Sequence, residues 1–304
     1  MTAAGLSRGH SRKIRLLKEF QPYFYVMPGM LVLLVLLVYP LVQIFILSVY
    51  DGSAFKRSFA GLANYIKLIQ DRDFWQAVAH SFIFTAASVF FHFLIGLTLA
   101  LLLHQKISTL VRSVFRGFLI LPWLIAPLVA AMIWMLMYLS FGILNGMLIN
   151  AGFIESGKIV SWLGDPKISL FSVTLVNIWR GFPFTMVMLL AALQGIPEDL
   201  YEAAKIDGAG SVKSFFNITL PSLKGTMLTV GLLDTIWTFR HFDIIFALTG
   251  GGPMNSSNVL TTSIYNTAFR AQQWGYSAAT AVMMFLFMAV FSLLYIRQID
   301  KEGV

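Results

Sequence analysis

The sequence predicts an all-α membrane protein in which six helices cross the bilayer. Of its 304 residues, 58% are hydrophobic and only 12% are charged, whereas an ordinary soluble domain carries about 25% charged residues. Six long apolar runs recur at even intervals, and a run of roughly 20 residues crosses a hydrocarbon core of about 30 Å as a helix. This even spacing favours one membrane domain over several soluble domains.

The six expected spans cover residues 27–50, 79–103, 115–139, 169–195, 222–248 and 277–297. The first span follows a basic segment, as a secretory signal does, but its apolar run is longer than the roughly 7 to 15 residues of a signal-peptide core. No cleavage motif of small residues closes that run. We therefore expect the first span to be an uncleaved anchor.

The basic residues predict the orientation of the chain. With the N-terminus inside, thirteen Lys and Arg residues fall on the inner side and seven on the outer side, while Arg180 and Arg240 fall within spans. Inner loops of membrane proteins carry such an excess. We expect a cytoplasmic basic segment at 1–26, a transmembrane domain at 27–297 and a cytoplasmic tail at 298–304.

The net charge and the absence of cysteine exclude several functions. The formal charge is +8, but the basic residues lie at the ends of apolar runs and form no stripe with interleaved aromatics. We expect a lipid bilayer, and no nucleic acid, around this chain. With no cysteine, disulfides, thiol catalysis and thiolate metal sites are excluded. The dispersed histidines lack metal-ligand spacing, so no metal site is expected.

A polar segment of small residues, YEAAKIDGAGSVKSFFNITLP at 201–221, separates the fourth and fifth spans. A helix is expected to start near Pro197 and to end at Gly208 in a left-handed turn. Ser211 is expected to cap a second helix that runs toward a stop at Pro221. This helix–glycine–helix element suits docking to another protein. It also fits an interfacial turn with no partner, and composition does not separate the two.

The same segment resembles the EAA motif of membrane permease subunits in binding-protein-dependent ABC importers. The motif is E-A-A, then D-G-A, an aromatic residue and I-x-L-P. The matching residues are Glu202, Ala203, Ala204, Asp207, Gly208, Ala209, Phe215, Ile218, Leu220 and Pro221. Flanking stretches at 179–184, 193–197, 242–245 and 248–253 resemble the carbohydrate-uptake branch, which serves maltose, other oligosaccharides or glycerol 3-phosphate.

The resemblance implies a type I ABC importer permease with a cytoplasmic coupling loop at 197–221. Glu202 would meet a basic residue in a groove of a separate ATPase subunit, and Gly208 would let the element bend. Implied partners are a second, related permease subunit, two ATPase subunits and an extracytoplasmic sugar-binding protein. A homodimer of this chain stays open as an alternative to the heterologous pair.

Catalysis and cofactors are then expected outside this chain. The resemblance implies that the chain is no enzyme and binds no cofactor, because ATP and magnesium sit on the ATPase subunits. It also implies the prokaryotic cytoplasmic membrane as the location. A membrane-embedded enzyme is disfavoured independently, because no catalytic pair lies at a common membrane depth.

Polar and aromatic residues within the fourth and fifth spans mark a candidate substrate pathway. Charged side chains within a membrane are costly, so they are expected to face the bundle interior or a water-filled cavity. The candidates are Trp179, Arg180, Phe184, Asp234, Trp237, Arg240, His241 and Asp243. Hydroxyls of a sugar need hydrogen-bond partners while the apolar face of its ring stacks on aromatic side chains.

Two alternatives to that pathway stay open. Arg240 with Asp243, or Arg180 with Asp234, can instead form interior pairs that hold helices together. Asp234, Arg240 and Asp243 can also serve an ion-coupled secondary transporter. Six spans without a detectable internal repeat make that second alternative the weaker one.

Overall fold

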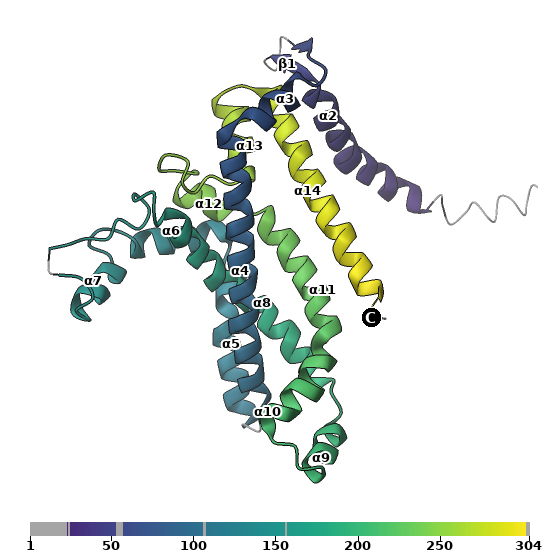
Figure 1. The fold of residues 1–304 in the computed structure, drawn as a ribbon, viewed down its shortest axis with the longest axis vertical. Coiled ribbons are helices and arrows are strands. Elements are labelled where there is room, and N and C mark those ends of the chain that lie inside the picture. Colours follow the sequence, from purple (N-terminus) through teal and green to yellow (C-terminus); the bar gives the residue numbers. More distant parts are fainter. Residues whose placement is uncertain (1–22, 24, 53–56, 106–107, 156, 302–304) are drawn as a thin grey trace, which may run out of the picture.

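The computed structural model describes residues 23, 25–52, 57–105, 108–155 and 157–301 of the chain. Most of the segment expected at 1–26 and the last residues of the tail lie outside this range. The described chain forms an elongated helical molecule (Figure 1). The hairpin of β1 (Tyr50–Gly52) and β2 (Arg57–Phe59) lies at one end. The bend containing α9 (Glu198–Ile206) and α10 (Ser211–Ser214) lies at the other.

Two long helices, α4 (Arg72–His104) and α8 (Ser169–Gln194), form the centre of the molecule. Asp71 starts α4 by accepting a hydrogen bond of 2.9 Å from the backbone N–H of Asp73, which satisfies one of the unpaired donors at a helix start. Gly96 allows close packing, because a Cβ there would lie 2.9 Å from the backbone nitrogen of Met186. Small residues at such contacts are typical of membrane helices.

The first described helix, Tyr25–Ser48, contains a π-helical turn, η1 (Leu34–Val38), and α2 (Tyr39–Ser48). It meets the last helix, α14 (Trp274–Lys301), near the hairpin, and the two diverge from there (Figure 1). None of the apolar window of this first helix is buried within the chain. Its surface is therefore left for lipid or for another protein.

A small cap covers the end where α2 and α14 meet. Strands β1 (Tyr50–Gly52) and β2 (Arg57–Phe59) pair antiparallel, with Tyr50 opposite Phe59, Asp51 opposite Ser58 and Gly52 opposite Arg57. Helix α3 (Ala63–Gln70) follows. Asn64 ties the cap together by donating to the carbonyls of Ser48 at 3.0 Å and Tyr50 at 2.8 Å.

The expected span 115–139 is not one straight helix. It is divided into α5 (Thr109–Leu124) and α6 (Pro127–Met137), which are bent by 96° at the break. Pro127 explains the break, because proline disfavours the helical conformation of the residue before it, and Ala126 is extended at ψ 140°. Helix α7 (Ile143–Asn150) follows, and α6 and α7 extend to one side of the molecule (Figure 1).

The expected span 222–248 is also interrupted. Helix α11 (Leu220–Phe239) ends before Arg240, and α12 (Asp243–Leu248) starts after a short break. Helix α13 (Leu260–Tyr265) and the π-helical turn η3 (Asn266–Arg270) lead into α14.

By length and composition, four helices of the described chain can cross a membrane, or up to five if the bent pair of α5 and α6 is one span. The four are the first helix, α4, α8 and α14. The chain is therefore a helical membrane protein, and the count of six spans stays a prediction.

Candidate functional site

The segment between the fourth and fifth expected spans forms a bend at the end of the molecule (Figure 1). Helix α9 (Glu198–Ile206) is capped by Asp207 and followed by Gly208, whose φ is +74°. The N–H of Gly208 donates to the carbonyl of Lys205, and the N–H of Ala209 donates to the carbonyl of Ala204 at 2.8 Å. These two bonds form a Schellman motif, which uses a left-handed glycine to close a helix. The left-handed turn predicted at Gly208 is present.

Two other details of this bend differ from the prediction. Ser211 is no cap, because Gly210 occupies the N-cap position of α10 (Ser211–Ser214) and no side chain caps the helix. Pro221 is no stop, because α10 continues through the π-helical turn η2 (Phe215–Thr219) into α11. In η2 the N–H of Leu220 bonds back five residues to Phe215, and this wider turn accommodates the proline that follows it.

The motif residues are presented on the outside of the bend. Glu202, Ala203, Asp207, Gly208 and Pro221 are exposed, whereas Ala204, Ala209 and Phe215 are half-buried. The hydroxyls of Tyr201 and Thr219 lie 2.9 Å apart and join α9 to η2. A hydrogen bond therefore stabilises the bend, while five of these eight motif residues are exposed.

Two apolar residues of the bend were missed by sequence reasoning. Ile206 is 87% exposed and Val212 is 73% exposed, although both belong to short helices next to Gly208. Their exposure indicates a surface that another protein can cover. Their position beside the acidic motif residues is the signal that could have identified them.

A second group of predicted residues surrounds a polar cavity of about 60 Å³ between α4, α8 and α11. Of the predicted set, Arg180, Phe184, Asp234, Trp237 and His241 line it. Sequence reasoning missed four further lining residues that carry polar or aromatic groups, His92, Trp123, Asn177 and Thr238, as members of the pathway. The only signal in the sequence that could have identified these four residues was the position of polar or aromatic side chains within apolar spans.

Asp234 forms hydrogen bonds with His92, a partner that the sequence did not predict. Its Oδ2 lies 2.9 Å from Nδ1 of His92, and its Oδ1 lies 3.1 Å from the same nitrogen. The hydroxyl of Thr238 donates to Oδ1 at 3.2 Å. Both carboxylate oxygens are therefore used within the protein, which weakens the assignment of Asp234 to ion coupling.

The expected pair of Arg180 and Asp234 does not form. Arg180 instead donates from Nε to the carbonyl of Ile125 at 3.2 Å, at the break between α5 and α6. The expected pair of Arg240 and Asp243 is also missing from the ion pairs of the described chain. The end of α11 at Phe239 explains this, because the two residues no longer lie one helical turn apart.

Three predicted pathway residues lie away from the cavity lining. Trp179 packs against Trp134 with ring centroids 5.7 Å apart and belongs to an apolar core cluster. Arg240 and Asp243 are exposed.

The polar cavity retains groups that can bind a hydroxyl or a water molecule. Within the described chain, Asn177 Nδ2 and His241 Nε2 are buried and have no hydrogen-bond partner. Phe184 bridges two indoles, with centroids 5.9 Å from Trp123 and 5.1 Å from Trp237. The volume is smaller than the roughly 300 Å³ of a small ligand pocket. This conformation therefore accommodates a few waters or one group of a sugar.

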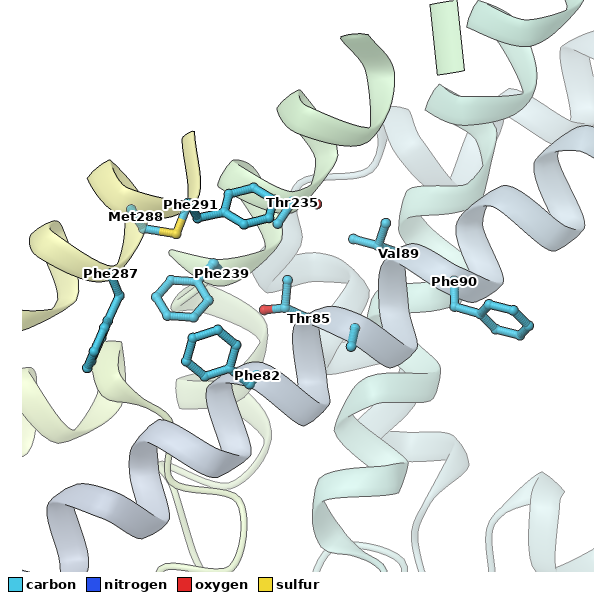
Figure 2. A pocket seen from close by; sticks show the side chains of 10 residues that line it. Phe82, Thr85, Val89, Phe90, Thr235, Phe239, Phe287, Met288 and Phe291 are labelled. Atoms are coloured by element: carbon cyan, nitrogen blue, oxygen red, sulfur yellow. The ribbon is translucent and has the colours of Figure 1, made fainter. Parts of the chain in front are cut away.

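Two larger hollows lie beside α11, and both are apolar. One, of about 390 Å³, lies between α4, α11 and α14, where the rings of Phe82, Phe239 and Phe287 gather (Figure 2). The other, of about 740 Å³, follows α11 from Leu220 to Thr235. Their linings have few groups that can bond to sugar hydroxyls, so the small polar cavity is the better candidate for a substrate pathway.

The chain belongs to a known family of transport proteins. Residues 92–300 match the family described as binding-protein-dependent transport system inner membrane component. The match covers more than half of the chain and includes both the bend and all the residues that line the polar cavity. The protein is therefore a transport subunit of an inner membrane and no enzyme.

Relatives of similar length extend this comparison. The chain is 34% identical over 278 residues to the trehalose/maltose transport system permease protein MalF of Thermococcus litoralis, covering 90% of this chain and 92% of that protein. It is 32% identical over 275 residues to the lactose transport system permease protein LacF of Rhizobium radiobacter, covering 90% and 91%. These are members of sugar transport systems.

A solved structure confirms the fold. The chain is similar to a subunit of a bacterial ABC transporter involved in the import of the acidic polysaccharide alginate, with a TM-score of 0.82 and 23% identity. The similarity covers 95% of this chain and 99% of that chain. The fold is therefore that of an ABC importer permease.

Proposed function

We propose that this chain is one permease subunit of an ATP-driven importer for a sugar or sugar derivative. The substrate class comprises oligosaccharides, glycosides and glycerol 3-phosphate. Relatives named for trehalose, maltose and lactose support a sugar substrate. A relative named for sulfoquinovosyl glycerol supports extending the class to derivatives.

The observation that carries this proposal is the exposed bend at Gly208. It projects from the end of the molecule (Figure 1) and combines acidic residues with exposed Ile206 and Val212. In the proposal, Glu202 pairs with a basic residue of an ATPase subunit while the apolar residues fill its groove. ATP and magnesium bind that subunit, and the bend transmits its motion to α8 and α11.

The proposed assembly contains two permease subunits, two ATPase subunits and an extracytoplasmic binding protein. The first helix, Tyr25–Ser48, whose apolar window has no residue buried within the chain, supports a neighbour or lipid around this part of the protein. In the proposed topology the chain spans the membrane six times. Four spans are the first helix, α4, α8 and α14; the fifth is the bent pair of α5 and α6, and the sixth is α11. Both termini and the bend then lie in the cytoplasm.

The proposed substrate route passes the polar cavity. Arg180, Asn177 and His241 supply polar groups, and the cluster of Trp123, Phe184 and Trp237 supplies apolar ring surface. With a volume of about 60 Å³, the cavity is too small for a whole sugar in this conformation. Opening by relative movement of α8 and α11 would admit a sugar.

Transport in proteoliposomes tests this function. The complex is reconstituted with its ATPase subunits and binding protein, and uptake of radiolabelled maltose, lactose and glycerol 3-phosphate is measured with ATP inside. The proposal predicts uptake of at least one of these that vanadate abolishes and that a protonophore leaves intact. Uptake that continues without ATP and stops with the protonophore would instead establish ion coupling.

A further inference from the structure

His92 joins three helices at the polar cavity. It lies on α4 and is 1% exposed. Its Nδ1 lies 2.9 Å from Oδ2 of Asp234 on α11, and its Nε2 lies 3.1 Å from the backbone carbonyl oxygen of Asn177 on α8. One side chain therefore connects α4 to both helices that carry the proposed substrate route.

The two contacts of the ring fix the number of protons in the pair. A backbone carbonyl can only accept a hydrogen bond, so Nε2 of His92 must carry a hydrogen. The contact between Nδ1 and the carboxylate needs a second hydrogen, on either the ring or Asp234. An ionised aspartate beside a neutral histidine would leave one of the two contacts without a hydrogen.

We propose that His92 and Asp234 form a buried pair that holds two protons and has no net charge, and that His92 is a positioning residue of the transport pathway. The pair sets α8 and α11 relative to α4, which brings Arg180 and Trp237 to the same cavity. Asp234 is then no binding group for substrate or ion. The positioning role rests on the proposed transport function, whereas the proton count of the pair does not.

Net neutrality matters because the pair is buried. An isolated ionised group away from water is strongly unfavourable, whereas a paired and hydrogen-bonded group is tolerated. The other charged or titratable groups around the pair are Arg180 on α8, His241 after α11 and Asp243 on α12. Removing the shared proton would leave a net negative charge among them and break one interhelical contact.

Gly181 supplies an independent argument for the position of His92. A Cβ at Gly181 would lie 2.2 Å from Nε2 of His92 and 2.3 Å from its Cε1. Any side chain at this position of α8 would therefore displace the imidazole ring from its contact with Asn177. Gly181→Ala should reproduce the loss of His92, although it leaves every atom of the pair in the chain.

Solid-state NMR of the reconstituted complex tests the proton count directly. The chain is labelled with 15N-histidine and measured near pH 8, above the ordinary histidine pKa of about 6.5. Of the five histidines, the signals lost in His92→Gln identify His92. The proposal predicts a hydrogen on Nε2 together with a second hydrogen, either on Nδ1 or on the Asp234 carboxyl group. The second position is read from 13C-labelled aspartate, in which the carboxyl signal lost in Asp234→Asn identifies Asp234. A His92 ring with a bare Nε2, or a bare Nδ1 beside an ionised Asp234 carboxylate, overturns the proposal.

Cysteine labelling tests the positioning role. The chain has no cysteine, so Trp237→Cys reports access to the cavity through its rate of reaction with a maleimide. In assembled complexes, Asp234→Asn and Gly181→Ala should each change this rate at least about fivefold, the effect of losing roughly 1 kcal/mol. The control Gly117→Ala lies on α5, where nothing is within 4 Å of the added Cβ, and should leave the rate unchanged.

Unchanged labelling in assembled Asp234→Asn and Gly181→Ala complexes overturns the positioning role. If these variants fail to assemble, the proton count is read from the unmodified complex, where transfer between 15N-histidine and 13C-aspartate labels selects the His92–Asp234 pair through its 2.9 Å contact. Neither measurement uses a sugar or ATP hydrolysis. A failure of this proposal is therefore distinguishable from a failure of the proposed transport function.

Discussion

Replacing Gly208 tests whether the shape of the bend is what a partner recognises. Its φ of +74° lies in the left-handed region, and no atom lies within 4 Å of the place where a Cβ would stand. A substitution is therefore costly only through the backbone. For an L residue the left-handed conformation costs roughly 1–2 kcal/mol, which lowers the equilibrium constant for this bend by about 5- to 30-fold.

The series Gly208→Asn, Gly208→Ala and Gly208→Val should weaken binding of the ATPase subunits in that order. Asparagine tolerates the left-handed region best and a β-branched residue worst. The affinity of the purified permease for its ATPase subunits is the measurement, and Gly208→Ala should raise Kd about 5- to 30-fold.

Gly210→Ala is the matched control for this series. Gly210 belongs to the same bend, has φ −74° and also has nothing within 4 Å of an added Cβ. Alanine adopts this conformation without strain, so Kd should stay unchanged. Equal Kd values for Gly208→Ala and Gly210→Ala would refute the reasoning.

Three further predictions concern the bend, the cavity and the outer end. Glu202→Lys should reduce recovery of the ATPase subunits in pull-downs, because it reverses the charge expected to face a basic groove; full recovery would contradict the pairing. Phe184→Ala should reduce substrate uptake several-fold in intact complexes. The control Phe118→Ala replaces a side chain on α5 that is 69% exposed, and it should leave uptake unchanged. Equal uptake by both variants would remove Phe184 from the pathway. Tyr276→Phe should lower the free energy of unfolding by about 1.5–3 kcal/mol, because the Tyr276 hydroxyl donates to the carboxylate of Asp71 at 2.5 Å. A thermal unfolding midpoint equal to that of the unmodified chain would show that this hydrogen bond contributes little.

Local signals in the sequence predicted the left-handed turn at Gly208, although they misplaced the cap of α10 and the effect of Pro221. Gly208 follows a short amphipathic helix, and its left-handed conformation depends only on its immediate neighbours. Long apolar runs likewise predicted α4, α8 and α14, because the bilayer requires continuous helices of that length. Such features need no information about distant parts of the chain.

Three of the prolines in helical regions show why other boundaries were not predictable. Pro127 accompanies a break of 96° between α5 and α6, Pro183 lies inside the continuous helix α8, and Pro221 follows a π-helical turn within a continuous segment. Proline removes one N–H in every case. Whether the helix breaks depends on packing and on the alternative hydrogen bonds that the surroundings provide.

The polar cavity depends on contacts between residues that are far apart in the sequence. His92 and Asp234 are 142 residues apart, and their contact exists only because α4 and α11 pack together with α8. Helical spacing placed Asp234, Trp237 and His241 on one side of the fifth span, and all three line the cavity. It could not show that His92 would take the carboxylate while Arg180 reached the break at Ile125.

The most direct test of the central claim is cross-linking from the bend in the assembled transporter. The chain has no cysteine, so Ala203→Cys, at an exposed position of α9, can carry a single photoactivatable label. Phe153→Cys, in the connection before α8 and 79% exposed, serves as the control on the expected outer side. The account predicts that Ala203→Cys cross-links to an ATPase subunit and Phe153→Cys does not. Labelling of lipid alone from Ala203→Cys, with the ATPase subunits present in the complex, would contradict it.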